Sequence, residues 1–402
     1  MRVLILTQLF PPEPDLKSLP LAKQLKARGH DVEVLTGFPN YPGGRIYDGY
    51  SIRPWTRQMV EGVPVTRVAH YPSHDRSGTQ RALNYLSFGV AAAALGPWLM
   101  QKPDLIYVYN LITLVPAAAL LRRLTGAKVV LDVQDLWPQS VESSGMLRSS
   151  AGLRVLRRWS DASYSSPDQL FVLSPGLKRH LVERGMPAER VEVIYNWSPE
   201  NPRPKEAALR AREVGTREGF QVLFAGTMGI LQGLDIVVDS ARLLLEQAPD
   251  VRFTLLGSGV DCERLMQAAD GLPNIEFLPR CPPSEVGRIL ASAEALLVHL
   301  KHDPLSEITI PSKLQAYMFA GKPILCGVRG DAAALVAEGS AGINFRPEDA
   351  ADLCRAVLQL RALPPTRLRE MGIEGRRFYE ENLSLSRGVD RMEAAFSRLT
   401  AS

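Results

Sequence analysis

Residues 221–259 read QVLFAGTMGILQGLDIVVDSARLLLEQAPDVRFTLLGSG. An apolar run at 221–225 leads into a glycine-containing turn at 226–229, and an amphipathic helical stretch follows from Leu234. A second apolar run at 252–256 then ends in another glycine turn. Two apolar strands separated by a helix are typical of a parallel sheet that is buried on both faces. This stretch therefore predicts an α/β fold.

The same alternation extends through both halves of the chain. Strands are predicted in the first half at Val3–Thr7, Asp31–Thr36, Val63–Val68, Leu105–Tyr109, Lys128–Asp132, Gln169–Leu173 and Val191–Tyr195. In the second half they are predicted at Gln221–Ala225, Arg252–Leu256, Ile275–Leu278, Ala295–Leu300, Pro323–Cys326 and Gly342–Phe345. Helical stretches fill most of the gaps, so two doubly wound Rossmann-like domains are expected in tandem.

The domain boundaries follow from composition. We predict an N-terminal domain over residues 1–198, a proline-rich linker over 199–219 and a C-terminal domain over 220–384. Residues 385–402 have the apolar spacing of a helix, which could cross back to the first domain.

Composition and charge exclude several classes of protein. The chain has 402 residues, of which 46% are hydrophobic and 22% charged, so disorder, collagen and coiled coils are excluded. The four cysteines form no CxxC pair and no export signal is visible, which favours a reducing cytosol. Residues 1–200 carry 23 Lys and Arg against 17 Asp and Glu. This excess points mildly to an anionic membrane surface or a phosphate-bearing partner, and not to nucleic acid.

Two segments of the sequence could contact a membrane. Residues 82–101 contain twenty uncharged residues, which predicts either a helix packed on the sheet or partial insertion into a membrane interface. Arg154, Arg157 and Arg158 fall on one face of a predicted helix. Such a face is commonly solvated, but a basic amphipathic helix is also typical of peripheral membrane enzymes.

Three turns in the second half could bind an anion. They lie at 226–233, at 257–259 and at 310–313, each after a strand or at the start of a helix. Exposed amide groups and the helix dipole favour a diphosphate at such places, although any parallel α/β domain also needs glycine turns. Lys313 would add a full positive charge. Neither GxGxxG nor a P-loop sequence is present.

The sequence resembles GT-B glycosyltransferases of family four. It looks closest to the branch of L-fucosamine or colanic-acid transferases of bacterial surface polysaccharides. The motifs that carry the resemblance are LTQLFPPE at 6–13, LKARGHDVEVLTG at 25–37, FPNYP at 38–42, DVQDLWP at 132–138, LSPG at 173–176, IYNW at 194–197, FAG at 224–226, QGL at 232–234, LGSG at 256–259 and IPSKLQAYMFAGKP at 310–323. They cover nearly the whole chain.

The resemblance implies two facing Rossmann-like domains with a cleft between them. A nucleotide-sugar donor would be held by the C-terminal domain and an acceptor by the N-terminal one. Family four enzymes retain the anomeric configuration and need no bound metal, and this sequence has no Asp-x-Asp motif. No other cofactor is implied.

The donor site departs from the family pattern. The family's Glu-x7-Glu signature falls on Ile308 and Ala316, whereas one residue upstream the chain has Glu307 and Gln315. The glycine loop of the family usually carries an Arg and a Lys. In this chain both are missing, and Met228 and Gln232 lie near their places. The predicted donor-binding residues are Gly226, Thr227, Met228, Gln232, Gly257, Arg280, Ser312, Lys313 and Gln315.

Candidate catalytic and acceptor groups lie at the ends of predicted strands. Glu307 and Asp135 could hold sugar hydroxyls or the acceptor proton, or could simply cap loops. Glu13, Lys17, Gln134 and Trp137 are candidates for acceptor binding, and the first two could equally be surface loop residues.

We therefore expect a retaining, metal-independent transferase that moves a sugar, N-acetyl-L-fucosamine or another N-acetylated sugar, from a UDP-sugar to a lipid-linked or saccharide acceptor. It is expected to work in the cytoplasm at the inner face of the membrane, in O-antigen or capsule synthesis. The alternatives are a nucleotide-sugar epimerase on the same fold and a non-catalytic sugar-nucleotide-binding partner of a membrane complex.

Overall fold

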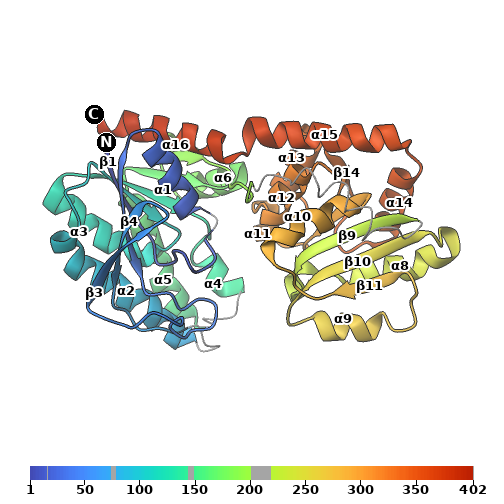
Figure 1. Ribbon diagram of the computed structural model, residues 1–402, viewed down its shortest axis with the longest axis horizontal. Helices are drawn as coiled ribbons and strands as arrows, with labels where there is room; N and C mark the ends of the chain where they lie inside the picture. The colour runs from blue at the N-terminus through green and yellow to red at the C-terminus, as the bar shows by residue number, and fades with distance from the viewer. Residues whose placement is uncertain (16, 74–77, 144–148, 201–218, 402) are drawn as a thin grey trace. The chain divides into compact units, whose positions relative to one another are not determined.

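In a computed structural model, the chain is described at residues 1–15, 17–73, 78–143, 149–200 and 219–401. Its contacts divide it into two compact units (Figure 1). The N-terminal unit comprises Met1–Tyr195 and Leu385–Ser402, and the C-terminal unit comprises Asn196–Ser384. Most of the predicted linker, residues 201–218, lies outside the described residues.

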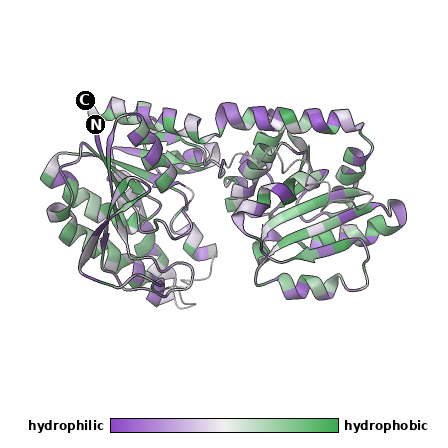
Figure 2. Ribbon diagram, in the orientation of Figure 1, coloured by the Kyte–Doolittle hydropathy of each residue, from purple (hydrophilic) through white to green (hydrophobic). Residues whose placement is uncertain are grey.

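The N-terminal unit contains an eight-stranded sheet. In spatial order its strands are β3 (Trp55–Val60), β4 (Val63–Val68), β2 (Asp31–Gly37), β1 (Arg2–Leu6), β5 (Leu105–Tyr109), β6 (Lys128–Val133), β7 (Gln169–Val172) and β8 (Val191–Val193). Seven of these strands lie close to their predicted positions. The central strands are mostly apolar and buried, as is typical of parallel strands that helices cover (Figure 2).

The edge of this sheet differs from the prediction of a purely parallel arrangement. β3 pairs with β4 in antiparallel fashion. Its sequence, WTRQMV, mixes polar and apolar residues because one side of the edge strand is exposed, so it gave no continuous apolar run.

Helices cover both faces of the N-terminal sheet (Figure 1). They are α1 (Ser18–Ala27), α2 (Gly78–Leu99), α3 (Val115–Thr125, preceded by the 3₁₀ turn Ile112–Leu114), α4 (Gln139–Ser143), α5 (Ser150–Ser165), α6 (Pro175–Glu183, followed by the 3₁₀ turn Ala188–Arg190) and α16 (Leu385–Thr400). The last helix packs on α1. It buries Val389, Met392 and Phe396, and the salt bridges of Arg28 to Asp390 and Glu393 fix its outer side.

The C-terminal unit contains a six-stranded parallel sheet. In spatial order the strands are β11 (Ile275–Leu278), β10 (Val251–Ser258), β9 (Phe220–Thr227), β12 (Ala295–His299), β13 (Ile324–Gly327) and β14 (Gly342–Asn344). The helices are α8 (Asp235–Gln247, preceded by the 3₁₀ turn Ile230–Gln232), α9 (Cys262–Ala268), α10 (Pro283–Ser292), α11 (Pro304–Glu307), α12 (Ser312–Ala320), α13 (Asp331–Glu338), α14 (Ala350–Arg361) and α15 (Pro365–Asn382). The predicted α/β class is confirmed in both units.

Candidate functional site

Two glycine turns lie side by side at the carboxyl ends of β9 and β10. Gly226 and Gly257 are register partners in these strands, with φ values of +143° and +144°. A Cβ atom on Gly257 would lie 1.9 Å from the carbonyl oxygen of Gly226, so a larger residue would force the turns apart. Gly226 and Thr227 are exposed. Their backbone therefore faces solvent at the sheet edge where open α/β sheets bind ligands.

Helix α12 places an ammonium group beside these turns. The hydroxyl of Tyr317 accepts a hydrogen bond from Ala225 N at 2.8 Å, which fixes the helix against the end of β9. One helical turn earlier, Lys313 Nζ lies 3.5 Å from the centroid of the Phe224 ring, and 3.2 Å from where a Cβ on Gly226 would be.

The Lys313 ammonium is buried and unsatisfied. Its Nζ has no hydrogen-bond partner among the residues that the structure describes. Burial lowers the pKa of Lys313 to about 7. A buried polar group without a partner costs free energy, and a bound anion would supply the missing partner.

The N-terminus of α12 is close by in the chain. Pro311 occupies the N-cap position and provides no side-chain cap. Ser312 is exposed at the first helical position. The first-turn amide groups and the helix dipole therefore add to the positive character of this end of the helix.

His299, at the carboxyl end of β12, joins two loops at this edge. Its Nδ1 lies 2.6 Å from the carbonyl oxygen of Gln232, and its Nε2 accepts a hydrogen bond of 3.0 Å from Glu348 N. The ring stacks on Phe345. These contacts require the neutral ring with its proton on Nδ1, and burial lowers the His299 pKa accordingly. The sequence reasoning missed His299, although a histidine that closes the apolar run ALLVH was a visible signal.

Several predicted donor residues are placed differently from expectation. The Met228 side chain is fully buried in the core of the C-terminal unit, so only the backbone of this residue belongs to the turn. The Gln232 carboxamide oxygen accepts a hydrogen bond from Gly229 N at 2.9 Å and so braces its own turn. Gln315 is only 2% exposed and does not present its amide to solvent. Arg280 is exposed after β11, at the edge of the sheet.

Glu307 ends the short helix α11 after β12. Its Oε1 lies 3.6 Å from His302 Nδ1, and both side chains are partly exposed. The carbonyl group of Glu307 packs so closely on Gly330 that a Cβ there would lie 2.0 Å from the oxygen. The carboxylate is thus held by a fixed backbone and is open to solvent, at the same sheet edge as Lys313.

The carboxyl edge of the N-terminal unit is built differently. Asp132, at the end of β6, is 1% exposed and accepts hydrogen bonds from Tyr107 and Gln134. Lys17 Nζ forms a salt bridge with Asp132 Oδ2 at 2.7 Å, and Lys17 is itself 3% exposed. Lys17 is therefore neither a surface residue nor free to reach an acceptor. Asp132 was missed in the sequence, where it appears as a lone carboxylate inside the apolar strand KVVLDV.

Glu13 is also an internal brace. Its Oε1 accepts hydrogen bonds of 2.8 Å from the backbone of both Asn40 and Tyr41, and Oε2 accepts one of 3.3 Å from Phe10 N. Burial raises the pKa of Glu13, and these three bonds and Arg67 oppose that rise. The alternative of a surface loop residue is wrong, because Glu13 is 3% exposed.

Asp135 and Trp137 lie beyond the Asp132 network. Although Asp135 is exposed at the surface, the protein that surrounds its carboxyl raises its pKa, and a hydrogen bond with the Asn110 side chain lowers it. The Trp137 backbone is held by Tyr164, whose hydroxyl accepts from its N–H at 2.9 Å, and by Arg184. Of the predicted acceptor-side groups, Asp135 is the exposed carboxylate.

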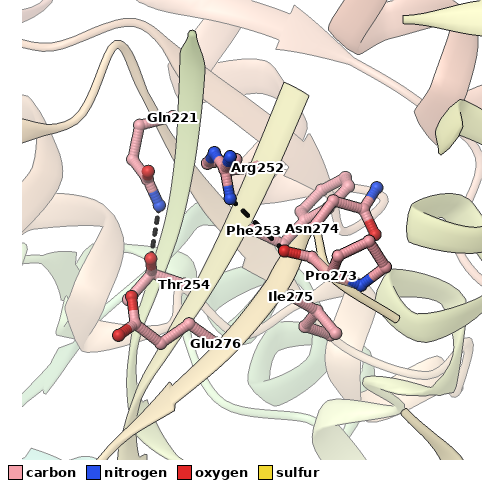
Figure 3. A pocket seen from close by; sticks show the side chains of 8 residues that line it. All are labelled: Gln221, Arg252, Phe253, Thr254, Pro273, Asn274, Ile275 and Glu276. Atoms are coloured by element: carbon pink, nitrogen blue, oxygen red, sulfur yellow. Dashed lines mark hydrogen bonds between the residues drawn. The ribbon is translucent and has the colours of Figure 1, made fainter. Parts of the chain in front are cut away.

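A cavity of about 180 Å³ lies in the C-terminal unit, and Figure 3 shows the side chains that line it. Gln221, Arg252 and Asn274 are among the residues that line it. It lies at the amino ends of β9, β10 and β11, opposite the glycine turns. Ligands in open parallel sheets bind at the carboxyl ends, so this cavity is not part of the candidate site. Within the described part of the chain, no three His, Cys, Asp or Glu side chains gather as metal ligands would.

Comparison with known proteins places this geometry in a family. Residues 18–197 match the Glycosyl transferase 4-like domain, and residues 219–362 match Glycosyl transferases group 1. WcaI of Escherichia coli K12, named for colanic acid biosynthesis, is 26% identical over 75% of this chain and 76% of its own length. WbjE of Pseudomonas aeruginosa, described as a glycosyltransferase, is 29% identical over 59% of this chain and 61% of its own.

Solved structures agree on the fold. Anabaena HepE superimposes with a TM-score of 0.68 at 15% identity, covering 99% of this chain and 100% of its own. Sucrose-phosphate synthase from Thermosynechococcus elongatus gives a TM-score of 0.72 at 16% identity, covering 100% and 99%. The chain therefore belongs to the GT-B glycosyltransferases of family four. Its N-terminal domain is of the glycosyl transferase 4-like type, and its C-terminal domain is of the glycosyl transferases group 1 type.

Proposed function

We propose that this glycosyltransferase takes its sugar from a UDP-sugar whose diphosphate is bound by Lys313 and the glycine turns at Gly226 and Gly257. The observation that carries the proposal is the buried Lys313 ammonium, which has no hydrogen-bond partner among the described residues and lies beside an exposed turn. HepE, a structural neighbour, has been crystallised with UDP and with UDP-glucose, which supports a uridine nucleotide as donor.

The transfer is proposed to retain the anomeric configuration and to need no metal. As the glycosidic bond breaks, the leaving diphosphate gains negative charge. A fixed ammonium and the first-turn amides of α12 stabilise this charge more in the transition state than in the ground state. Glu307 on the donor side and Asp135 on the acceptor side are the carboxylates proposed to hold sugar hydroxyls or to take the acceptor proton.

The product is proposed to be a bacterial surface polysaccharide, such as an O-antigen or a capsule. Relatives named for colanic acid and teichuronic acid synthesis support this class. N-acetyl-L-fucosamine, as the transferred sugar, rests on the branch resemblance in the motifs quoted above. The acceptor is proposed to be lipid-linked or a saccharide, which fits an enzyme associated peripherally with the cytoplasmic side of the membrane.

The test is thermal unfolding with UDP in the presence of EDTA. UDP should raise the melting temperature of the wild type by mass action, and Lys313→Ala should abolish most of that shift. Lys322→Ala, which removes a lysine just beyond the other end of α12, is the matched control and should keep the shift. Stabilisation that requires magnesium would contradict the metal-free proposal, and an equal shift in Lys313→Ala would place the diphosphate elsewhere. Product analysis with and without acceptor separates transfer from epimerisation.

A further inference from the structure

Helix α2 packs one face on the sheet and exposes an apolar face to solvent. The inner face buries Asn84, Phe88, Gly89, Ala92 and Gly96. On the outer face Leu83 is 54% exposed, Leu86 48%, Val90 69% and Trp98 84%. At 100° per residue these four positions fall within about 120° of the helix circumference.

Neighbouring elements extend this apolar face. Helix α3 packs on α2 and exposes Leu120 and Leu124. We call Leu83, Leu86, Val90, Trp98, Leu120 and Leu124 the α2 surface. On the edge strand β3, Trp55 and Met59 are exposed on the same side as Arg57, whose guanidinium hydrogen-bonds to the Leu99 carbonyl at the end of α2. Alternate residues of a strand share a face, so Trp55 and Met59 flank the α2 surface.

The elements that form and flank this surface carry cations, although the carboxylates of Glu33 and Asp168 lie nearby. β3, α2 and α3 contain no Asp or Glu, but they contain Arg57, Arg81, Arg122 and Arg123. Arg122 is paired with Asp168, whereas Arg123 is exposed. Exposed apolar side chains that gather on neighbouring elements and are rimmed by polar residues are typical of an interaction surface.

The helix cannot leave the unit to cross a bilayer, although it is long and apolar enough to do so. Its buried Asn84 accepts a hydrogen bond of 2.5 Å from Gln8 and donates one of 2.7 Å to the Tyr71 carbonyl. Together with Phe88 and Ala92 in the core, these bonds hold α2 on the sheet. The outer face can therefore lie on a membrane while the inner face stays in the protein.

We propose that the α2 surface docks on the headgroup region of an anionic lipid bilayer. Leucine and valine side chains would enter the acyl boundary, Trp98 would sit at the interface, and Arg57 and Arg123 would face lipid phosphates. This deepens, and rests on, the peripheral association proposed above. It places the contact on α2 and α3. The sequence had suggested two membrane segments, residues 82–101, which form most of α2, and the arginine face of α5.

The test is cosedimentation of the full chain with vesicles of phosphatidylglycerol and phosphatidylcholine. Wild type should bind at low salt and release as salt rises. Val90→Glu should reduce the partition coefficient at least tenfold, and Val90→Gln by less. Ile373→Glu is the matched control, because it adds the same charge at an exposed apolar residue of the C-terminal unit, and it should bind within twofold of wild type.

A second experiment distinguishes binding through helix α2 from binding through helix α5. Reversing Arg154, Arg157 and Arg158 to Glu, with α2 intact, should leave most binding in place. If that variant loses binding while Val90→Glu keeps it, the α2 surface is the wrong surface but peripheral association stands. If wild type does not bind, peripheral association itself fails. Sedimentation of the protein without lipid tests whether this face is a contact between two copies. If wild type is a dimer that Val90→Glu dissociates, the proposal is overturned. Sugar transfer to a soluble acceptor, measured separately, should be unaffected by Val90→Glu.

Discussion

The carboxyl edges of the two sheets use charge in opposite ways. In the N-terminal unit, Lys17 and Asp132 are almost completely buried and satisfy each other. In the C-terminal unit, the Lys313 ammonium is also buried, but it lies against the Phe224 ring and a glycine turn and has no hydrogen-bond partner among the described residues. The contrast assigns the Lys17 charge to the fold and supports the proposal that Lys313 binds a ligand.

This difference has a physical basis. A buried ion pair with good geometry offsets much of its own desolvation, so removing one partner is far more costly than the pair is worth. An unpaired ammonium has no such compensation in the ligand-free protein. A ligand of opposite charge supplies the missing partner of such an ammonium group. Ionisable groups with strongly shifted pKa values cluster at functional sites for this reason.

The largest effect is expected for Asp132→Ala. The substitution leaves the Lys17 ammonium buried without its counter-charge and removes the acceptor for Tyr107 and Gln134. We expect a loss of about 3–5 kcal/mol in the free energy of unfolding of the N-terminal unit, measured by urea denaturation. The control is Asp31→Ala, whose carboxyl pairs with Arg2 and is 54% exposed, and which should cost less than about 1 kcal/mol.

A double variant sharpens this result. Lys17→Met with Asp132→Leu removes both charges and should recover much of the lost stability, because an apolar pair can replace a buried ion pair. Equal losses in Asp132→Ala and Asp31→Ala would show that the burial of the pair contributes nothing.

The next effect is on catalysis. Lys313→Ala removes the charge that we propose to stabilise the leaving diphosphate, and turnover should fall by about 10²–10³, or ~2.7–4 kcal/mol. Ser312→Ala removes a neutral hydroxyl and should cost about 0.5–1.5 kcal/mol. Steady-state transfer is the measurement, with circular dichroism as the folding control. A folded Lys313→Ala enzyme within about threefold of wild type (under ~1 kcal/mol) would remove Lys313 from the donor site.

A third, smaller effect has the opposite sign. Lys313→Met removes an unsatisfied buried ammonium, so the ligand-free protein should become more stable, by about 1–3 kcal/mol at pH 6. The Lys313 pKa is lowered from 10.5 to about 7 in the folded protein. Between these values the unfolded chain binds more protons, so wild-type stability rises with pH. The advantage of Lys313→Met should therefore be greatest below pH 7 and shrink towards pH 10.5. A constant advantage at every pH would mean that charge is not its cause.

The sequence predicted the fold closely because continuous apolar runs between helices leave little choice of arrangement. It missed β3, since an edge strand with one exposed side does not alternate clearly. The glycine turns and Lys313 were found because glycine and lysine at strand and helix ends are local signals. The positions of Glu13, Lys17 and Met228 were not predictable in the same way. Whether each of these side chains faces solvent or the interior depends on contacts with other segments of the chain, such as that of Glu13 with Asn40 and that of Lys17 with Asp132.

The smallest effect concerns charges of the N-terminal unit that lie at its surface. Glu393 of α16 accepts one hydrogen bond of 2.7 Å from Arg28, and its other oxygen lies 2.7 Å from His30 Nε2. These side chains are partly exposed, so Glu393→Gln should cost only about 0.2–1 kcal/mol in the free energy of unfolding, far less than Asp132→Ala.

Arg28, and then His30, lower the pKa of Glu393 below its ordinary 4.5. The stabilisation is therefore present above pH 4.5 and is lost as the pH falls through the lowered pKa, and 1 M salt should weaken it at neutral pH. Urea midpoints of wild type and Glu393→Gln, compared at pH 7 in low and high salt and again at pH 3, measure the effect. A loss as large as that of Asp132→Ala, or one that salt and acid leave unchanged, would show that exposure does not separate the two networks as we argue.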